Sequence, residues 1–104
     1  MRRAFLARVD EMIKNEPDTV FFTVDIGMWA IRDILREYPL RASNVGIFED
    51  GMTGIAAGMA ARGLIPTIFG IQPYVIERAF EQIKMDLAYQ KLGINVVGTG
   101  AAVD

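Results

Sequence analysis

Residues 19–24 read Thr-Val-Phe-Phe-Thr-Val, an unbroken run of β-branched and aromatic side chains. A strand that is apolar on both faces is typical of the interior of a parallel sheet, which helices cover on both sides. Hydrophobic periodicity around this run predicts helices at residues 2–14, 28–37, 51–61 and 73–91, and further strands at residues 44–48, 66–70 and 94–97. This alternation predicts right-handed strand–helix–strand units. We therefore expect an α/β fold with three layers, α/β/α, around a parallel sheet of about four strands.

Length and charge limit the chain to one small domain with few kinds of partner. Its 104 residues carry 11 Lys and Arg against 13 Asp and Glu, a net charge of −2. That balance excludes a strongly basic nucleic-acid-binding module. No apolar run approaches the ~18 residues that a membrane span requires, and no signal-peptide core follows the first residues. We therefore expect a cytoplasmic protein without nucleic-acid or membrane partners.

The sequence contains neither cysteine nor histidine. Without cysteine there is no disulfide and no thiolate zinc site. Without histidine, proton transfer near neutral pH falls to a carboxylate, a lysine, a tyrosine or a nitrogen atom of a cofactor.

Three polar residues follow predicted strands at the point where each strand ends. Asp25 follows the first strand, Glu49 follows the second, and Tyr74 lies shortly after the third. Ligands of open parallel sheets bind at the carboxyl ends of the strands, which all lie at one edge. We therefore expect these three side chains to share a site.

The carboxylates are also consistent with a purely structural role. A negative charge in the first turn of a helix stabilises it by ~0.3–1 kcal/mol, and Glu49 or Asp50 could serve the helix at residues 51–61 in this way. Asp25 is equally consistent with a cap for the helix at residues 28–37. A phosphoacceptor site on Asp25 and Glu49 would need a lysine at a later strand end, and the sequence has none there.

The helix expected at residues 73–91 has two distinct faces. Its predicted apolar face consists of Ile76, Ala79, Phe80, Ile83 and Leu87. A polar stripe is predicted beside that face by the four-residue spacing of Arg78, Gln82 and Asp86. Such a stripe is typical of a solvated surface, with a polar subunit interface as the alternative.

Three segments together resemble a known family. They are Asn-Val-Gly-Ile-Phe-Glu-Asp-Gly-Met-Thr-Gly-Ile-Ala-Ala-Gly-Met-Ala at residues 44–60, Gly-Leu-Ile-Pro at residues 63–66, and Arg-Ala-Phe-Glu-Gln-Ile-Lys-Met-Asp at residues 78–86. In motif and spacing they resemble the pyrimidine-binding domain of transketolases, above all the C-terminal subunit of split bacterial and archaeal transketolases. Deoxyxylulose-phosphate synthases and the β subunits of 2-oxo-acid dehydrogenases share part of the pattern. The resemblance runs from about Phe5 to the end of the chain.

This resemblance implies a fold and a cofactor. We expect residues 1–104 to form a transketolase-like pyrimidine-binding domain, a shortened form of the thiamine-diphosphate-binding fold that stops before its last strands. The family binds thiamine diphosphate between two domains, usually from different chains. A glutamate at the position of Glu49 hydrogen-bonds N1′ of the aminopyrimidine ring and thereby activates the cofactor. The family's two aromatic residues beside that ring align with Ile71 and Tyr74, and Asp25 aligns with an aspartate near the thiazolium side.

The resemblance also implies what other chains must supply. In the family, a Gly-Asp-Gly…Asn motif on another domain holds the diphosphate and its Mg²⁺, and this sequence lacks that motif. No metal ligands are therefore expected in this chain. We expect the Gly-Pro-Thr-His loop and the C-terminal domain of the family, which residues 1–104 do not contain, to come from elsewhere.

We therefore expect a transketolase-like transferase subunit of a hetero-oligomer. It would be active only with a diphosphate-binding transketolase subunit and possibly a further chain that carries the C-terminal domain. Its substrates would be sugar phosphates or similar small molecules, in ketol or acyl transfer. The alternatives are a non-catalytic scaffold subunit that keeps the fold, or a fragment of a deoxyxylulose-phosphate synthase or of a 2-oxo-acid dehydrogenase β subunit.

Overall fold

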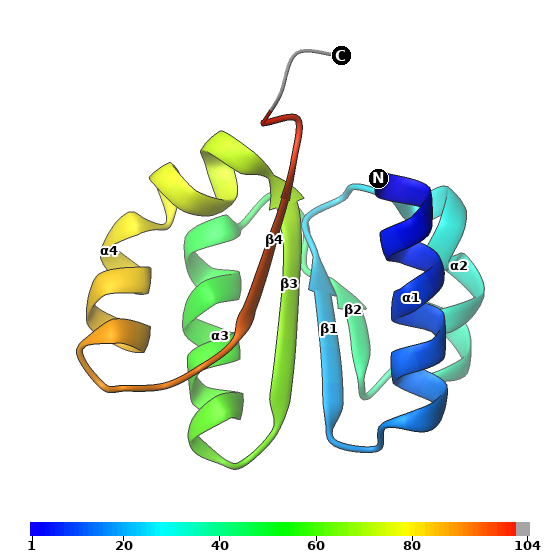
Figure 1. The fold of residues 1–104 in the computed structure, drawn as a ribbon, viewed down its shortest axis with the longest axis horizontal. Helices are drawn as coiled ribbons and strands as arrows, with labels where there is room; N and C mark the ends of the chain where they lie inside the picture. The colour runs from blue at the N-terminus through cyan, green and yellow to red at the C-terminus, as the bar shows by residue number, and fades with distance from the viewer. Residues whose placement is uncertain (102–104) are drawn as a thin grey trace.

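The computed structural model describes residues 1–101, in which helices and strands alternate along most of the chain (Figure 1). The elements are α1 (Arg2–Asn15), β1 (Thr19–Thr23), α2 (Met28–Glu37), β2 (Ala42–Asn44), α3 (Glu49–Ala61), β3 (Ile65–Ile71), η1 (Pro73–Arg78), α4 (Phe80–Gln82), η2 (Ile83–Ala88) and β4 (Asn95–Thr99). The α/β class predicted from the sequence is confirmed. Among the described residues, no helix is both long and apolar enough to cross a membrane.

The sheet has four strands in the order β2-β1-β3-β4, and all of its neighbouring pairs are parallel. β1 lies inside the sheet, where Phe21 pairs with Ala42 of β2 on one side and with Thr67 of β3 on the other. Every residue of β1 is buried, which confirms the interior strand predicted from residues 19–24. Helices α1 and α2 cover one face, and α3 covers the other together with the η1–α4–η2 segment (Figure 1).

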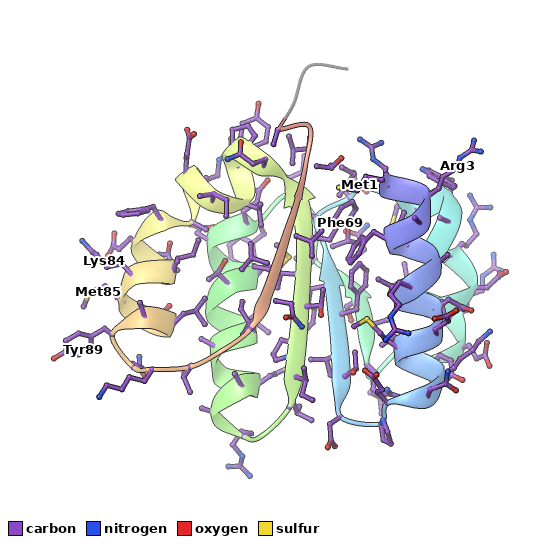
Figure 2. The ribbon with its side chains drawn as sticks, in the orientation of Figure 1. Met1, Arg3, Phe69, Lys84, Met85 and Tyr89 are labelled. Atoms are coloured by element: carbon purple, nitrogen blue, oxygen red, sulfur yellow. The ribbon has the colours of Figure 1, made fainter. Side chains whose placement is uncertain are left out.

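Two apolar cores fill the spaces between the sheet and its helix layers. The core beneath α1 and α2 consists of Leu6, Val9, Ile13, Phe21, Ile31, Ile34, Ala42 and Phe69. The core beneath α3 and η1 consists of Val20, Phe22, Val24, Met52, Ala56, Ile68 and Val75. Successive side chains of a strand point to opposite faces, so β1 contributes to both cores. Figure 2 shows Phe69 in the layer on the α1 side, where its ring centroid lies 5.1 Å from that of Phe5.

The second strand occupies a different position from the one predicted. β2 covers Ala42–Asn44, so the prediction of a strand at residues 44–48 is wrong. The Asn44 side chain ends the strand, because its Oδ1 accepts a hydrogen bond from the Gly46 backbone N–H at 3.0 Å. Gly46 then turns the chain with a φ of 78°. Helix α3 begins at Glu49, two residues earlier than predicted, so a short loop rather than a strand leads into Glu49.

The single long helix predicted at residues 73–91 is also wrong. The segment consists of two π-helical stretches, η1 and η2, with the short α4 between them. A π-helix bonds each residue to the fifth along the chain, so its side chains do not follow the 3.6-residue period of an α-helix. Of the residues predicted on its buried face, Ala79 and Leu87 are buried, whereas Phe80 is 58% exposed. Figure 2 shows Lys84, Met85 and Tyr89 on the outer side of this segment, pointing away from the sheet.

The last strand also runs further than the sequence predicts. β4 covers Asn95–Thr99 rather than residues 94–97, and its register pairs Gly70 with Gly98 and Ile71 with Thr99.

Candidate functional site

A pocket of about 370 Å³ opens at the carboxyl edge of the sheet, where β1 and β3 end. Its walls are formed by Val24, Asp25, Ile26, Ile47, Glu49, Ile71, Tyr74 and Arg78. The four candidate site residues from the sequence, Asp25, Glu49, Ile71 and Tyr74, thus all line one pocket. Arg78 joins them, although its spacing in the sequence placed it in a surface stripe.

Asp25 lies in the loop between β1 and α2 and takes an unusual backbone conformation. Its φ is 60°, in the left-handed region that a non-glycine residue rarely adopts. The Asp25 backbone N–H donates to Oδ1 of Asn44 at 2.7 Å, and Nδ2 of Asn44 donates to Oδ1 of Asp25 at 3.2 Å. The N-cap of α2 is Gly27, and no side chain caps that helix. The alternative of Asp25 as a helix cap is therefore wrong, and its conformation is held by Asn44 instead.

Glu49 stands in the first turn of α3 and points into the interior. Its side chain is only 4% exposed, and Oε2 accepts a hydrogen bond from Nη1 of Arg78 at 3.2 Å. Glu49 and Asp50 both lie in the first turn of α3, where their negative charges stabilise the helix as the structural alternative predicted, although the N-cap residue itself makes no side-chain cap. Asp50 is exposed, and its Oδ1 accepts only from the N–H of the adjacent Gly51. Of the two neighbouring carboxylates, Glu49 alone reaches the pocket.

Tyr74 and Arg78 reach the pocket from the π-helical segment η1, directly after β3. The guanidinium carbon of Arg78 lies 4.5 Å from the centroid of the Tyr74 ring, a cation–π distance. Arg78 therefore contacts both the ring of Tyr74 and the carboxylate of Glu49. π-Helical turns occur frequently at functional sites. Arg78 lies four residues after Tyr74, a spacing that places two side chains on the same face of a helix, so the sequence carried a signal for Arg78 that its assignment to a surface stripe left unused.

The pocket combines apolar walls with one buried carboxylate. Ile47, Ile71 and Tyr74 supply exposed apolar surface, and Glu49 supplies a hydrogen-bond acceptor deep between them. Pockets for small ligands are mostly apolar with a few placed polar groups, and this volume is within their usual range. Such a site suits a ligand with flat apolar faces and one edge group that hydrogen-bonds a carboxylate.

The pocket offers no ligand set for a metal ion. Among residues 1–101, no group of three or more His, Cys, Asp or Glu side chains is placed to hold one. Arg78, the one positive side chain among the described residues that line the pocket, is paired with Glu49.

Comparison with known proteins identifies the family. The family profile described as "Transketolase, pyrimidine binding domain" matches residues 1–104. An apulose-4-phosphate transketolase subunit of Actinobacillus succinogenes is 36% identical over 87 residues, which are 83% of this chain and 28% of that protein. 1-Deoxy-D-xylulose-5-phosphate synthase of Clostridium perfringens is 35% identical over 91 residues, which are 84% of this chain and 14% of that protein.

The fold comparison agrees with the sequence comparison. A split-gene transketolase, described as an inactive β4 tetramer, matches with a TM-score of 0.81 and 28% identity, over 93% of this chain and 32% of its own. The chain spans about a third of the length of the transketolase subunits that it matches. Because the family profile covers the whole chain and the fold agrees, this chain belongs to the family of transketolase pyrimidine-binding domains.

Proposed function

We propose that this chain forms the pyrimidine-binding half of a thiamine-diphosphate site, with Glu49 as the residue that contacts the aminopyrimidine ring. The observation that carries the proposal is the position of Glu49, a 4% exposed carboxylate at the base of an apolar pocket on the carboxyl edge of the sheet. Membership of a family of thiamine-diphosphate-dependent enzymes supplies the identity of the ligand.

The residues present fit an aminopyrimidine. Glu49 would accept or hold a proton at N1′ of the ring, which needs no histidine. Ile71 and Tyr74 would contact the ring and exclude water from it, and Asp25 would face the thiazolium side. When bound, thiamine diphosphate supplies the electron sink for breaking and forming a carbon–carbon bond. The proposed reaction class is the transfer of a two-carbon ketol or acyl unit between sugar phosphates or similar small molecules.

The other half of the site is proposed to come from a partner chain. The described residues contain no metal-ligand cluster, so the proposal assigns Mg²⁺ and the diphosphate group to a diphosphate-binding transketolase subunit. Two observations support a multi-chain enzyme: a similar relative is named as one subunit of a transketolase, and the structural neighbour is an inactive β4 tetramer of a split-gene transketolase. A further chain with the C-terminal domain is part of the same proposal. The cytoplasmic location stays a prediction from the sequence.

Glu49→Gln, tested beside Asp50→Asn, separates this proposal from a scaffold role. The two substitutions each remove one negative charge from the first turn of α3, but only Glu49 lines the pocket. The chain is co-expressed with the products of its neighbouring genes, and thiamine-diphosphate binding and ketol transfer are measured in the purified complex. Because a positioned proton-transfer group contributes ~10²–10⁴-fold, Glu49→Gln is expected to lower turnover at least ~100-fold. Asp50→Asn is expected to leave turnover within about twofold of the wild-type value.

Each further outcome has a definite meaning. Equal turnover in the wild type and in Glu49→Gln would overturn the assignment of Glu49. A complex that binds the cofactor and turns over without this chain would identify the chain as a scaffold subunit.

A further inference from the structure

Glu49, Arg78 and Tyr74 form a connected group on one wall of the pocket. Nη1 of Arg78 lies 3.2 Å from Oε2 of Glu49, and its guanidinium carbon lies 4.5 Å from the Tyr74 ring centroid. The Arg78 side chain is 48% exposed, whereas that of Glu49 is 4% exposed. The half-exposed Arg78 therefore contacts the buried carboxylate of Glu49 from the side that faces solvent.

The ion pair divides the two oxygens of Glu49 between two roles. Oε2 is taken by Arg78, and Oε1 accepts no hydrogen bond from any described residue. No buried side-chain oxygen among residues 1–101 lacks a partner, so Oε1 keeps some contact with solvent, and Glu49 lines the pocket. Oε1 is thus the oxygen left available to a ligand.

The Tyr74 ring supports the guanidinium from a second side, with 4.5 Å between the guanidinium carbon and the ring centroid. The guanidinium is planar and can pack flat on an aromatic ring, which the compact ammonium group of a lysine cannot. Tyr74 and Arg78 lie four residues apart within the π-helical η1, which presents both side chains to the pocket. A lysine at this position would keep the charge but not the planar contact.

We propose that Arg78 is a positioning residue of this site: it acts through Glu49, holding Oε2 so that Oε1 is aimed at the ring nitrogen of the bound aminopyrimidine. This inference rests on the proposed function, since it specifies how Glu49 is held for that ligand. Arg78 itself would not contact the reacting atoms.

A double-mutant cycle tests this coupling. The affinity for thiamine diphosphate in the presence of Mg²⁺ is measured by titration calorimetry in the co-expressed complex, for wild type, Glu49→Gln, Arg78→Gln and the double variant. Hydrogen bonds to charged groups are the strong ones, so Arg78→Gln is expected to weaken binding about tenfold. In the Glu49→Gln background, the same change is expected to weaken binding less than about twofold, because the charge-assisted part of the interaction is already lost.

Matched variants distinguish coupling through Glu49 from a general structural effect of changing Arg78. Arg78→Lys is expected to restore part of the affinity, and Arg62→Gln, an exposed arginine at the end of α3, is expected to change nothing. If Arg78→Gln does not fold, Arg78→Lys completes the same cycle. Equal losses from the Arg78 change in both Glu49 backgrounds would overturn the inference while leaving the proposed function intact. A wild-type complex that binds no thiamine diphosphate would overturn the proposed function, and this inference with it.

Discussion

The side chain of Asn44 holds Asp25 from the neighbouring strand through both of its polar atoms. Oδ1 of Asn44 accepts the backbone N–H of Asp25 at 2.7 Å, and Nδ2 donates to the Asp25 carboxylate at 3.2 Å. The same Oδ1 accepts the backbone N–H of Gly46 at 3.0 Å. One amide thus joins the loop after β1 to the loop after β2, and these two loops carry Asp25 and Ile47 to the pocket. The left-handed conformation of Asp25 persists because these bonds compensate for it.

Asn44→Ala is expected to lower the free energy of unfolding by about 1–2 kcal/mol. Each hydrogen bond contributes ~1 kcal/mol, and the exposure of Asn44 allows water to replace part of what is lost. Urea denaturation measures the change. The control is Asn15→Ala, at the exposed end of α1, which is expected to stay within ~0.5 kcal/mol of wild type. Equal effects of the two substitutions would show that Asn44 does not hold the loops together.

Gly27→Ala and Gly46→Ala are expected to differ in cost, although both glycines have a positive φ, 75° and 78°. A Cβ at Gly46 would meet nothing within 4 Å, so only the backbone conformation is penalised, by ~1–2 kcal/mol. A Cβ at Gly27 would lie 3.0 Å from Cδ1 of the buried Leu6 and 3.4 Å from the Phe69 ring. Overpacking is therefore expected to lower the free energy of unfolding of Gly27→Ala by a further ~1–3 kcal/mol. Denaturation midpoints that agree for the two variants would contradict this packing argument.

The sequence predicted the parts of the fold that depend on regular apolar patterns. Residues 19–24 are apolar on both faces, and that property is sufficient to place β1 inside the sheet. The position of β2 could not be predicted in the same way. It is set by the turn at Gly46 and by the hydrogen bonds between Asn44 and Asp25, which lie 19 residues apart in the chain.

From the sequence, only those site residues that follow the ends of strands could be predicted. Because parallel strands end at one edge, Asp25, Glu49 and Tyr74 could be expected to lie together, and all three line the pocket. Arg78 was predicted in a polar stripe with Gln82 and Asp86, although its four-residue distance from Tyr74 is also consistent with a place in the site. Spacing within one helix cannot decide between these two positions, because the partner of Arg78 in the pocket, Glu49, lies 29 residues earlier in the chain.

Phe69→Ala and Phe80→Ala compare a buried phenylalanine with an exposed one. Phe69 is fully buried and contacts the rings of Phe5 and Phe21, so its removal is expected to cost ~3–5 kcal/mol. Phe80 is exposed and has Lys84 5.9 Å from its ring, so its removal is expected to cost less than ~1 kcal/mol. Phe69→Leu keeps more apolar volume and should fall between them in urea denaturation. A loss for Phe80→Ala as large as that for Phe69→Ala would mean that Phe80 packs in the interior.

Ile71→Phe is expected to tighten thiamine-diphosphate binding in the assembled complex about 2- to 10-fold. Ile71 ends β3 on the wall of the pocket beside Tyr74, and the resemblance to transketolases places an aromatic residue there. An aromatic ring at this position would add a second flat surface for the aminopyrimidine, and such pairs contribute ~0.5–1.5 kcal/mol beyond the area they bury. Because Ile71 is exposed, the free energy of unfolding should stay within ~0.5 kcal/mol of wild type.

The control for Ile71→Phe is Ile65→Phe, an exposed isoleucine at the opposite end of the same strand, away from the pocket. It adds the same apolar surface to the protein, so it should leave the cofactor affinity unchanged. Titration calorimetry of both variants compares the two ends of β3 directly. If Ile71→Phe weakens binding while Ile65→Phe does not, Ile71 borders the ligand but leaves no room for a larger ring. If neither variant changes the affinity, the ring of the ligand does not lie against the end of β3, and Ile71 would have to be removed from the proposed site.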